Sequence, residues 1–328
     1  MVKKINQQTS SYWEQRRAKE EEWIKENLSN DEAFNRQLQV YYDQAINNID
    51  EMIKANTDLI TDKATGKVTE ADVRSYETKA KSIVLEAQKR LKAGQKVQYG
   101  DYDKQINNHL KIYNATMRIN RLEWIKSNIG LEMVQLGLNV DADLRDKLSA
   151  DYQKEIKRQS GIMGESVGKL SSSSITAQII LAQTKGATFS QRLWANQDVL
   201  KSKLDQVIAN GIIQGQSNQR VARNLRDQLK STVDNQRYVT ERLARTESSR
   251  VQAQAEILSM KGNGFKYCIW IDEPRACAEC KQIANKDNGW GKGVYLVDDV
   301  PFLPAHPNCR CVLSAYWVER LSLENLAQ

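Results

Sequence analysis

The motifs Cys-Ala-Glu-Cys (277–280) and His-Pro-Asn-Cys-Arg-Cys (306–311) set one end of this chain apart from the rest. All five cysteines lie between residues 268 and 311, with all four prolines and one of the two histidines. The preceding residues contain neither cysteine nor proline, and long stretches of them follow helical periodicity. The sequence therefore predicts a mainly α chain, with an elongated helical N-terminal bundle, a helical middle and a small α+β C-terminal module.

The spacing within the two motifs is typical of a zinc site. A pair of cysteines two residues apart is a common half of such a site, and a histidine followed by a cysteine supplies the other half. Three thiolates and one imidazole suit the tetrahedral preference of Zn²⁺, which is borderline-soft. The candidate ligands are Cys277, Cys280 and His306, with either Cys309 or Cys311 as the fourth. A disulfide and an unligated thiol cluster are the alternatives.

The size of the module gives a physical reason for a structural metal. A segment this short, with several glycines and prolines, builds a poor apolar core, and structural zinc can contribute about 10–16 kcal/mol of apparent folding free energy. Cys309 and Cys311 face the same side if the chain is extended, with Arg310 opposite. Cys268 lies in the stretch 265–272, which is rich in β-formers and predicts a strand, and we expect it to be a buried apolar residue.

A catalytic zinc site is not indicated. Such a site keeps one position open for water and needs a general base, whereas the predicted ligands fill all four positions. A nucleotide deaminase needs His-x-Glu, but His109 is followed by Leu-Lys and His306 by Pro-Asn. We expect His109 to be a solvated or core residue. The prediction is a structural zinc and no catalytic residues.

Upstream of the module, apolar residues recur at steps of three and four, as on one face of a helix. The first stripe comprises Phe34, Leu38, Tyr41, Ala45, Ile49 and Met52. In the first part of the chain, helices are predicted over 10–59, over 69–93 with Thr69 as the cap and Asp72 three residues later, and over 101–136 with an end at Gly137. Further helices are predicted over 175–184, capped by the serine run 171–174, and over 190–210. The last two are predicted to start at the cap Ser217 and to cover 233–260. The predicted domains are a bundle or arm (1–140), a basic helical domain (141–262) and the Cys/His module (263–328).

The net charge of +7 is concentrated in the middle of the chain, where residues 145–260 hold 18 Lys/Arg and 11 Asp/Glu. Long basic side chains can bind the phosphates of a nucleic acid without recognising its base sequence. The candidates for such contacts are Arg220, Arg223, Arg226 and Lys230. The alternative is a solvated charged face with local ion pairs. Arg245 and Glu247 are predicted to form a structural ion-pair node, and Glu247 has no evident catalytic partner.

Charged residues make up 27% of the chain, and no apolar run approaches the roughly 20 residues of a membrane span. The first residues carry lysines but no apolar stretch typical of a signal peptide. We therefore expect a soluble protein without a membrane anchor, in a reducing cytoplasm where clustered cysteines bind metal more often than they form disulfides.

Four features occur in the same order as in a known family. They are Gly215-Gln-Ser217 before a helix, Ala244-Arg245-Thr246-Glu247, Trp270-Ile-Asp272 before Cys277-x2-Cys280, and Pro304-Ala-His306-Pro-x-Cys309-Arg310-Cys311. Over about residues 186–317 the chain resembles the Mu F-like minor head proteins of tailed phages, also called head morphogenesis proteins. The matching positions are the cysteines and histidine named above and Glu247.

This resemblance implies a non-enzymatic minor capsid component near the portal, acting in head assembly, DNA packaging or ejection. It implies a location in the head interior of the virion, and in the host cytoplasm during assembly. The expected partners are the portal protein, the major capsid or scaffold protein, and phage DNA bound without sequence specificity. The alternatives are a metal-dependent nuclease or processing hydrolase, and a nucleic-acid-binding regulator.

Overall fold

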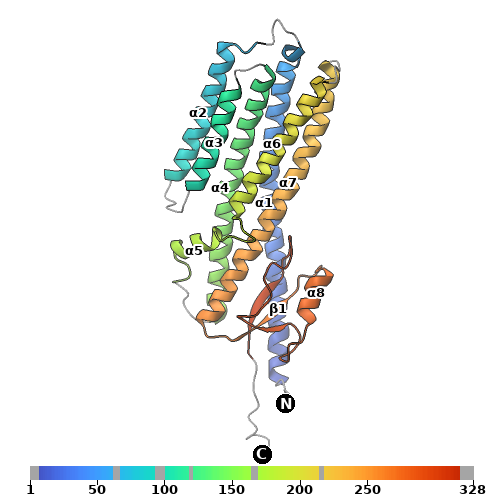
Figure 1. Ribbon diagram of the computed structural model, residues 1–328. Coiled ribbons are helices and arrows are strands. Elements are labelled where there is room, and N and C mark those ends of the chain that lie inside the picture. The colour runs from blue at the N-terminus through green and yellow to red at the C-terminus, as the bar shows by residue number, and fades with distance from the viewer. Residues whose placement is uncertain are drawn as a thin grey trace, which may run out of the picture. The chain divides into compact units, whose positions relative to one another are not determined.

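The structure is a computed structural model, in which residues 7–61, 67–92, 100–117, 121–163, 169–213 and 218–317 are described (Figure 1). These ranges contain eight α-helices and three short β-strands. In chain order they are α1 (Gln7–Thr61), α2 (Glu70–Lys92), α3 (Gly100–Thr116), α4 (Arg121–Met163), α5 (Ser173–Ile180), α6 (Phe189–Ile213), α7 (Asn218–Gly262), β1 (Tyr267–Ile271), α8 (Ala278–Asn285), β2 (Val294–Leu296) and β3 (Val312–Tyr316). The predicted fold class, mainly helical with a small C-terminal α+β module, is confirmed.

The chain folds into two compact units, each assembled from separate segments. The first unit consists of residues 1–34, 145–182 and 242–328, and the second of residues 35–144 and 183–241. The long helices α1, α4 and α7 contribute residues to both. The division into domains at residues 140 and 262 stays a prediction.

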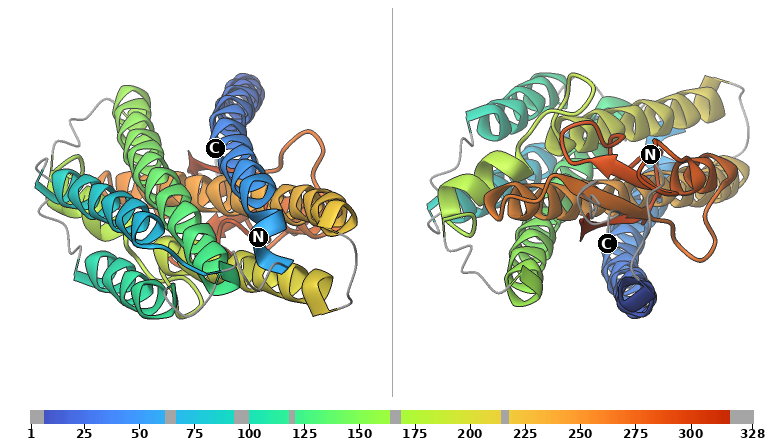
Figure 2. Two further views of the ribbon diagram at one scale, coloured as in Figure 1. Left: turned by 90° about the horizontal axis from the view of Figure 1, so that it is seen from above. Right: turned by 90° about the horizontal axis from the view of Figure 1, so that it is seen from below.

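The second unit is a helical bundle in which α2, α3 and α6 lie beside parts of α1, α4 and α7 (Figures 1 and 2). Its core consists of large apolar side chains, among them Leu38, Ile49, Tyr76, Ile83, Tyr113, Ile129, Phe189 and Leu200. Most of the predicted stripe on α1 is buried, although Tyr41 and Met52 are less buried than their neighbours Tyr42 and Ile53. The period of three and four therefore identified the core face to within one residue.

The predicted cap of α2 is confirmed. The Asp72 backbone N–H donates to Thr69 Oγ1 at 3.2 Å, and the Thr69 N–H donates to Asp72 Oδ2 at 2.8 Å. This reciprocal pair satisfies two backbone donors that the helix itself leaves unpaired. Ser172, in the predicted capping run, caps α5. The predicted helix end at residue 93 and the predicted helix start at Ser217 lie outside the described residues.

The prediction that a helix ends at Gly137 is wrong. The structure has two helices in place of the one predicted over 101–136, and α4 passes through Gly137 to Met163. A Cβ atom on Gly137 would lie 2.8 Å from the indole ring of Trp194. The glycine is therefore explained by the close approach of α6, and not by a helix end.

We expect Gly137→Ala to destabilise the protein by about 1–3 kcal/mol, because the added methyl group overpacks against a buried ring. Alanine forms helices better than glycine, so a site with free space should respond in the opposite direction. Gly161→Ala on the same helix is the matched control, because a Cβ atom added there would have no neighbouring atom within 4 Å. Urea unfolding of both variants measures the difference; equal stabilisation by both would contradict the packing explanation.

The predicted helices from Ser217 and over 233–260 are one continuous helix, α7, so the boundary between them is wrong. Leu229 and Val233 are both buried and lie four residues apart, on one face of a single helix. The helices predicted to end at residues 184 and 210 end at Ile180 and Ile213.

In the first unit a three-stranded antiparallel sheet, ordered β2-β1-β3, packs between α7 and α1. One face contributes to a core that includes Ala253, Met260, Cys268, Trp270 and Leu313. The other face contributes to a core of Trp23, Ile24, Ile271 and Val312. Successive residues of β1 and β3 thus enter opposite cores, which follows from the two-residue period of a strand. The predicted strand is β1; β2 and β3 were not predicted.

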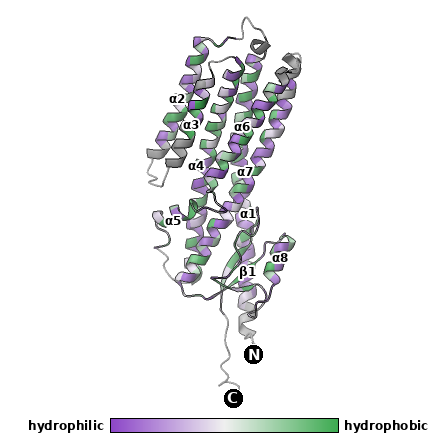
Figure 3. Cartoon of the chain, viewed as in Figure 1, coloured by the Kyte–Doolittle hydropathy of each residue, from purple (hydrophilic) through white to green (hydrophobic). Residues whose placement is uncertain are grey.

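Hydrophilic residues recur along the helices of both units (Figure 3). Among the described residues, no helix combines the length and the apolar character needed to cross a membrane.

Candidate metal centre

The first half of the candidate site is the N-terminus of α8. Cys277 is the N-cap residue, and its Sγ accepts a hydrogen bond from the Cys280 backbone N–H at 3.5 Å. A thiol in this place can satisfy a backbone donor, as the oxygen of serine or aspartate does in other caps. Cys280 then lies one turn into the helix and is fully buried, whereas Cys277 is exposed.

The second half is the loop that carries His306, Cys309 and Cys311. The Cys309 N–H donates to the His306 carbonyl oxygen at 3.2 Å, which closes a tight turn. Asn308 within the turn has a φ of 69°. Asparagine is among the few residues that adopt this left-handed conformation with little strain, so the sequence of the turn suits its backbone.

The structure brings all five candidate ligands together. His306 Nε2 lies 3.1 Å from Cys277 Sγ and 3.1 Å from Cys280 Sγ, and the sulfur atoms of Cys280 and Cys309 are 3.7 Å apart. Two overlapping groups, Cys277–Cys280–His306 and Cys280–Cys309–Cys311, each have all their donor atoms within 4.8 Å of one another. This cysteine–histidine cluster can hold a metal ion.

The electrostatics of the cluster fit a cation. Burial raises the pKa of Cys280, and the neighbouring Cys309 raises it further. A hydrogen bond between Cys311 and Cys309 raises the pKa of the Cys311 thiol and lowers that of Cys309 to about 6. Protein groups alone thus favour a single buried thiolate, because like charges at this distance repel. A divalent cation among the sulfur atoms would remove that repulsion and favour the deprotonated form of each ligand.

A second layer of contacts holds the ligand loop in place. Thr246 Oγ1 of α7 accepts a hydrogen bond from the Asn308 N–H at 3.1 Å, and Glu273 Oε1 accepts from the Arg310 N–H at 3.3 Å. Arg245 of α7 in turn forms an ion pair with Glu273 at 3.4 Å. Outer contacts of this kind orient metal ligands in many proteins. Two residues of the Arg-Thr-Glu motif, Arg245 and Thr246, therefore hold the ligand loop against α7.

A comparison with known families finds a match that includes this cluster. Residues 202–314 match the family described as Phage Mu protein F like protein. This match covers about a third of the chain. The match begins within α6, includes α7 and both cysteine motifs, and ends in β3. No curated protein and no solved structure matches the chain.

Within the Mu F-like segment, the predicted node of Arg245 and Glu247 divides into two ion pairs. Arg245 contacts Glu273 and Asp31, whereas Glu247 contacts Arg250 Nε at 2.6 Å. Arg250 also donates to the carbonyl oxygens at the end of α5, 2.9 Å from that of Ile179. Glu247 and Arg250 are both buried, so this pair joins α7 to α5 in the interior of the first unit.

The burial of Cys268 and the direction of the Arg310 side chain agree with the predictions from the sequence. Cys268 is fully buried in the sheet, as predicted, and burial raises its pKa to about 12. Arg310 points away from the thiols and binds Asp31 at 2.8 Å, as the alternation of an extended chain predicted. The contribution of Glu273 was missed, because a glutamate beside a proline gives no local signal of its partner.

The candidate nucleic-acid residues lie on the N-terminal half of α7. Arg223, Arg226 and Lys230 are exposed, and the side chain of Arg220 is outside the described side chains. Arg226 Nε lies 3.0 Å from Asp50 Oδ1, so part of its charge is balanced within the second unit. The other histidine, His109, contacts Asp198 Oδ1 at 2.6 Å.

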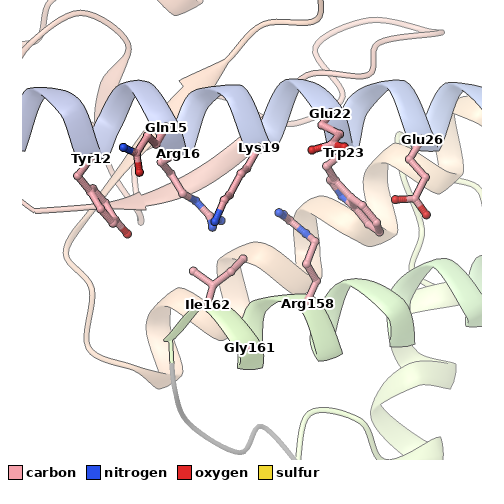
Figure 4. A pocket seen from close by; sticks show the side chains of 10 residues that line it. All are labelled: Tyr12, Gln15, Arg16, Lys19, Glu22, Trp23, Glu26, Arg158, Gly161 and Ile162. Atoms are coloured by element: carbon pink, nitrogen blue, oxygen red, sulfur yellow. The ribbon is translucent and has the colours of Figure 1, made fainter.

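A pocket of about 490 Å³ opens in the first unit between α1 and the end of α4 (Figure 4). Figure 4 shows Arg16 and Arg158 extending into the space between the two helices. Both form ion pairs with the buried carboxylate of Glu20, at 2.9 Å for Arg158. Because this carboxylate balances their charge from within the protein, we assign no ligand to the pocket.

Proposed function

We propose that this chain is a structural head protein of a tailed phage that acts in head morphogenesis. The observation that carries the proposal is the Mu F-like match, which includes both cysteine motifs and the helix that supports them. Within that function we propose a minor head protein near the portal, in contact with the portal, major capsid or scaffold protein, and acting in assembly, DNA packaging or ejection.

Proteomic and genetic analysis of phage heads tests this proposal. The chain should be present in purified DNA-filled heads, in fewer copies than the major capsid protein. Deletion of its gene should reduce the yield of infectious, DNA-filled heads, and a plasmid-borne copy should restore it. Absence from both procapsids and mature heads would rule out a head protein.

We further propose that the cysteine–histidine cluster binds one structural zinc ion through Cys277, Cys280, His306 and Cys309. Zn–S bonds of about 2.3 Å in a tetrahedron separate two thiolates by about 3.8 Å, and the 3.7 Å between Cys280 and Cys309 agrees with this. Cys311 remains a further donor beside Cys309. When bound, zinc would supply folding free energy by cross-linking the start of α8 to the ligand loop.

The enzyme alternatives receive no support from the site. Glu247, the carboxylate of the Arg-Thr-Glu motif, is 1% exposed and paired with Arg250, so water and substrate do not reach it. Purified protein with zinc or magnesium should leave plasmid DNA uncut. Cleavage that disappears in Glu247→Ala or His306→Ala would favour a metal-dependent nuclease instead.

DNA contact through α7 is a separate part of the proposal, supported by the exposed side chains of Arg223, Arg226 and Lys230. Replacing all three with glutamine should weaken binding to any DNA sequence. The negative slope of log K against log salt concentration should become less steep, by roughly one for each phosphate that is no longer neutralised. Fluorescence anisotropy at several salt concentrations measures this. Glutamine at the exposed Lys19, Lys25 and Lys81 is the charge-matched control. Unchanged binding in the α7 variant would contradict the placement, and a site-specific footprint would favour a regulator.

A further inference from the structure

Arg310 occupies an unusual position between two of the candidate ligands. The sulfur atoms of Cys309 and Cys311 point into the cluster, and the side chain of Arg310 extends from the opposite side of the same loop backbone. Its side chain is only 2% exposed. Any displacement of the ligand loop therefore displaces a buried guanidinium group as well.

The guanidinium group is fixed by two partners from different helices. Its Nε donates to Asp31 Oδ2 at 2.8 Å and its Nη2 donates to the other carboxylate oxygen, a bidentate contact with α1. Its Nη1 donates to Gln252 Oε1 of α7 at 2.6 Å. A planar fork matched to a carboxylate is the strongest and most directional ion pair that proteins form.

The partners of Arg310 are themselves linked. Gln252 Nε2 donates to Asn27 Oδ1 of α1 at 3.0 Å, and Asp31 also lies 3.3 Å from Lys147 of α4. Lys147 pairs with Asp151 at 2.9 Å. All these groups belong to the first unit and are buried or nearly so. The network thus joins α1, α4 and α7 to the ligand loop at one point.

We propose that Arg310 couples metal binding at the cysteine–histidine cluster to the packing of α1 within the first unit, an inference that rests on the metal proposed above. Metal binding fixes the backbone on both sides of Arg310, which holds the guanidinium group in register with Asp31. Packing of α1 in turn holds the ligand loop in its binding conformation. Such coupling is reciprocal: each event strengthens the other by the same factor.

The unmodified chain gives the first test. Hydrogen exchange, followed by mass spectrometry, is compared for residues 12–34 in the zinc-loaded protein and after removal of zinc with a chelator. Exchange in this part of α1 should become roughly 10–100-fold faster without zinc, the range in which outer-shell partners affect metal sites. Equal exchange in the two states overturns the coupling.

The variant Arg310→Lys gives the second test, because lysine keeps the charge but lacks the bidentate fork. Its zinc affinity, measured by competition with a chromophoric chelator, should fall roughly 10–100-fold, and exchange in α1 should no longer depend on zinc. Glu26→Gln is the matched control, because Glu26 lies on α1 like Asp31 but forms an exposed ion pair, with Lys154 of α4. It should leave zinc affinity and α1 exchange unchanged.

The outcomes separate the two proposals. If the unmodified chain binds no zinc, the metal proposal fails and the coupling fails with it. If zinc binds but Arg310→Lys keeps the unmodified affinity, only the coupling fails. If Arg310→Lys does not fold, the exchange comparison on the unmodified chain decides alone.

Discussion

Cys280→Ser is expected to abolish zinc binding and to unfold the C-terminal module. Cys280 is the one ligand shared by both groups of the cluster, and it is fully buried. Structural zinc contributes about 10–16 kcal/mol in small zinc-dependent folds, as much as the whole stability of a typical domain. Metal content should fall from one zinc per chain to none. The backbone amides of the sheet and α8 should lose their protection against hydrogen exchange.

Cys268→Ala is the matched control for this experiment. Cys268 is as buried as Cys280 and lies in the same apolar core, but it belongs to neither ligand group. The variant should keep one zinc per chain and lose only about 1 kcal/mol, as is usual for removal of a small buried group. A fully loaded, folded Cys280→Ser protein would contradict the ligand assignment.

Arg158→Met is expected to cost about 3–5 kcal/mol, because it removes a cation shared by three buried carboxylates, although Glu20 keeps its ion pair with Arg16. Arg158 of α4 contacts Glu20 at 2.9 Å, Glu155 at 2.7 Å and Glu256 at 3.7 Å. These carboxylates come from α1, α4 and α7, and each is at most 1% exposed. Urea unfolding at pH 7 measures the loss.

Lys154→Met is the control for Arg158→Met. Lys154 lies one turn away on α4 and stacks on the same ring, that of Trp23, but its ion pair with Glu26 is exposed. Exposed pairs contribute at most about 1 kcal/mol. Similar losses in the two variants would show that stacking on Trp23, and not the buried charges, explains the effect.

The stability loss caused by Arg158→Met should depend on pH, because the buried carboxyl groups can bind protons. Burial raises the pKa of Glu256, the nearby Glu155 raises it further, and Arg158 opposes both effects. Without Arg158 the folded-state pKa rises more, so the folded variant binds protons at a pH where the unfolded chain has lost them. Its stability relative to the unmodified protein should therefore improve as the pH falls from 7 toward 5. A loss that is constant over this range would contradict the charge explanation.

The sequence by itself determined the features whose causes lie within a few neighbouring residues. The steps of three and four located the buried face of α1, and Thr69 with Asp72 located the start of α2. The spacing of Cys277, Cys280, His306 and Cys309 predicted that these side chains meet, because the knuckle and the tight turn are local structures. Alternation along the chain predicted the direction of Arg310.

Only the tertiary structure decided the features that depend on residues far along the chain. Gly137 has the local signature of a helix end, but the ring of Trp194 makes it a contact point inside α4. No local pattern pairs Arg310 with Asp31, or brings Glu20, Glu155 and Glu256 to one arginine. Propensity and periodicity act over one or two turns of chain, whereas close packing and the neutralisation of buried charge select partners in space.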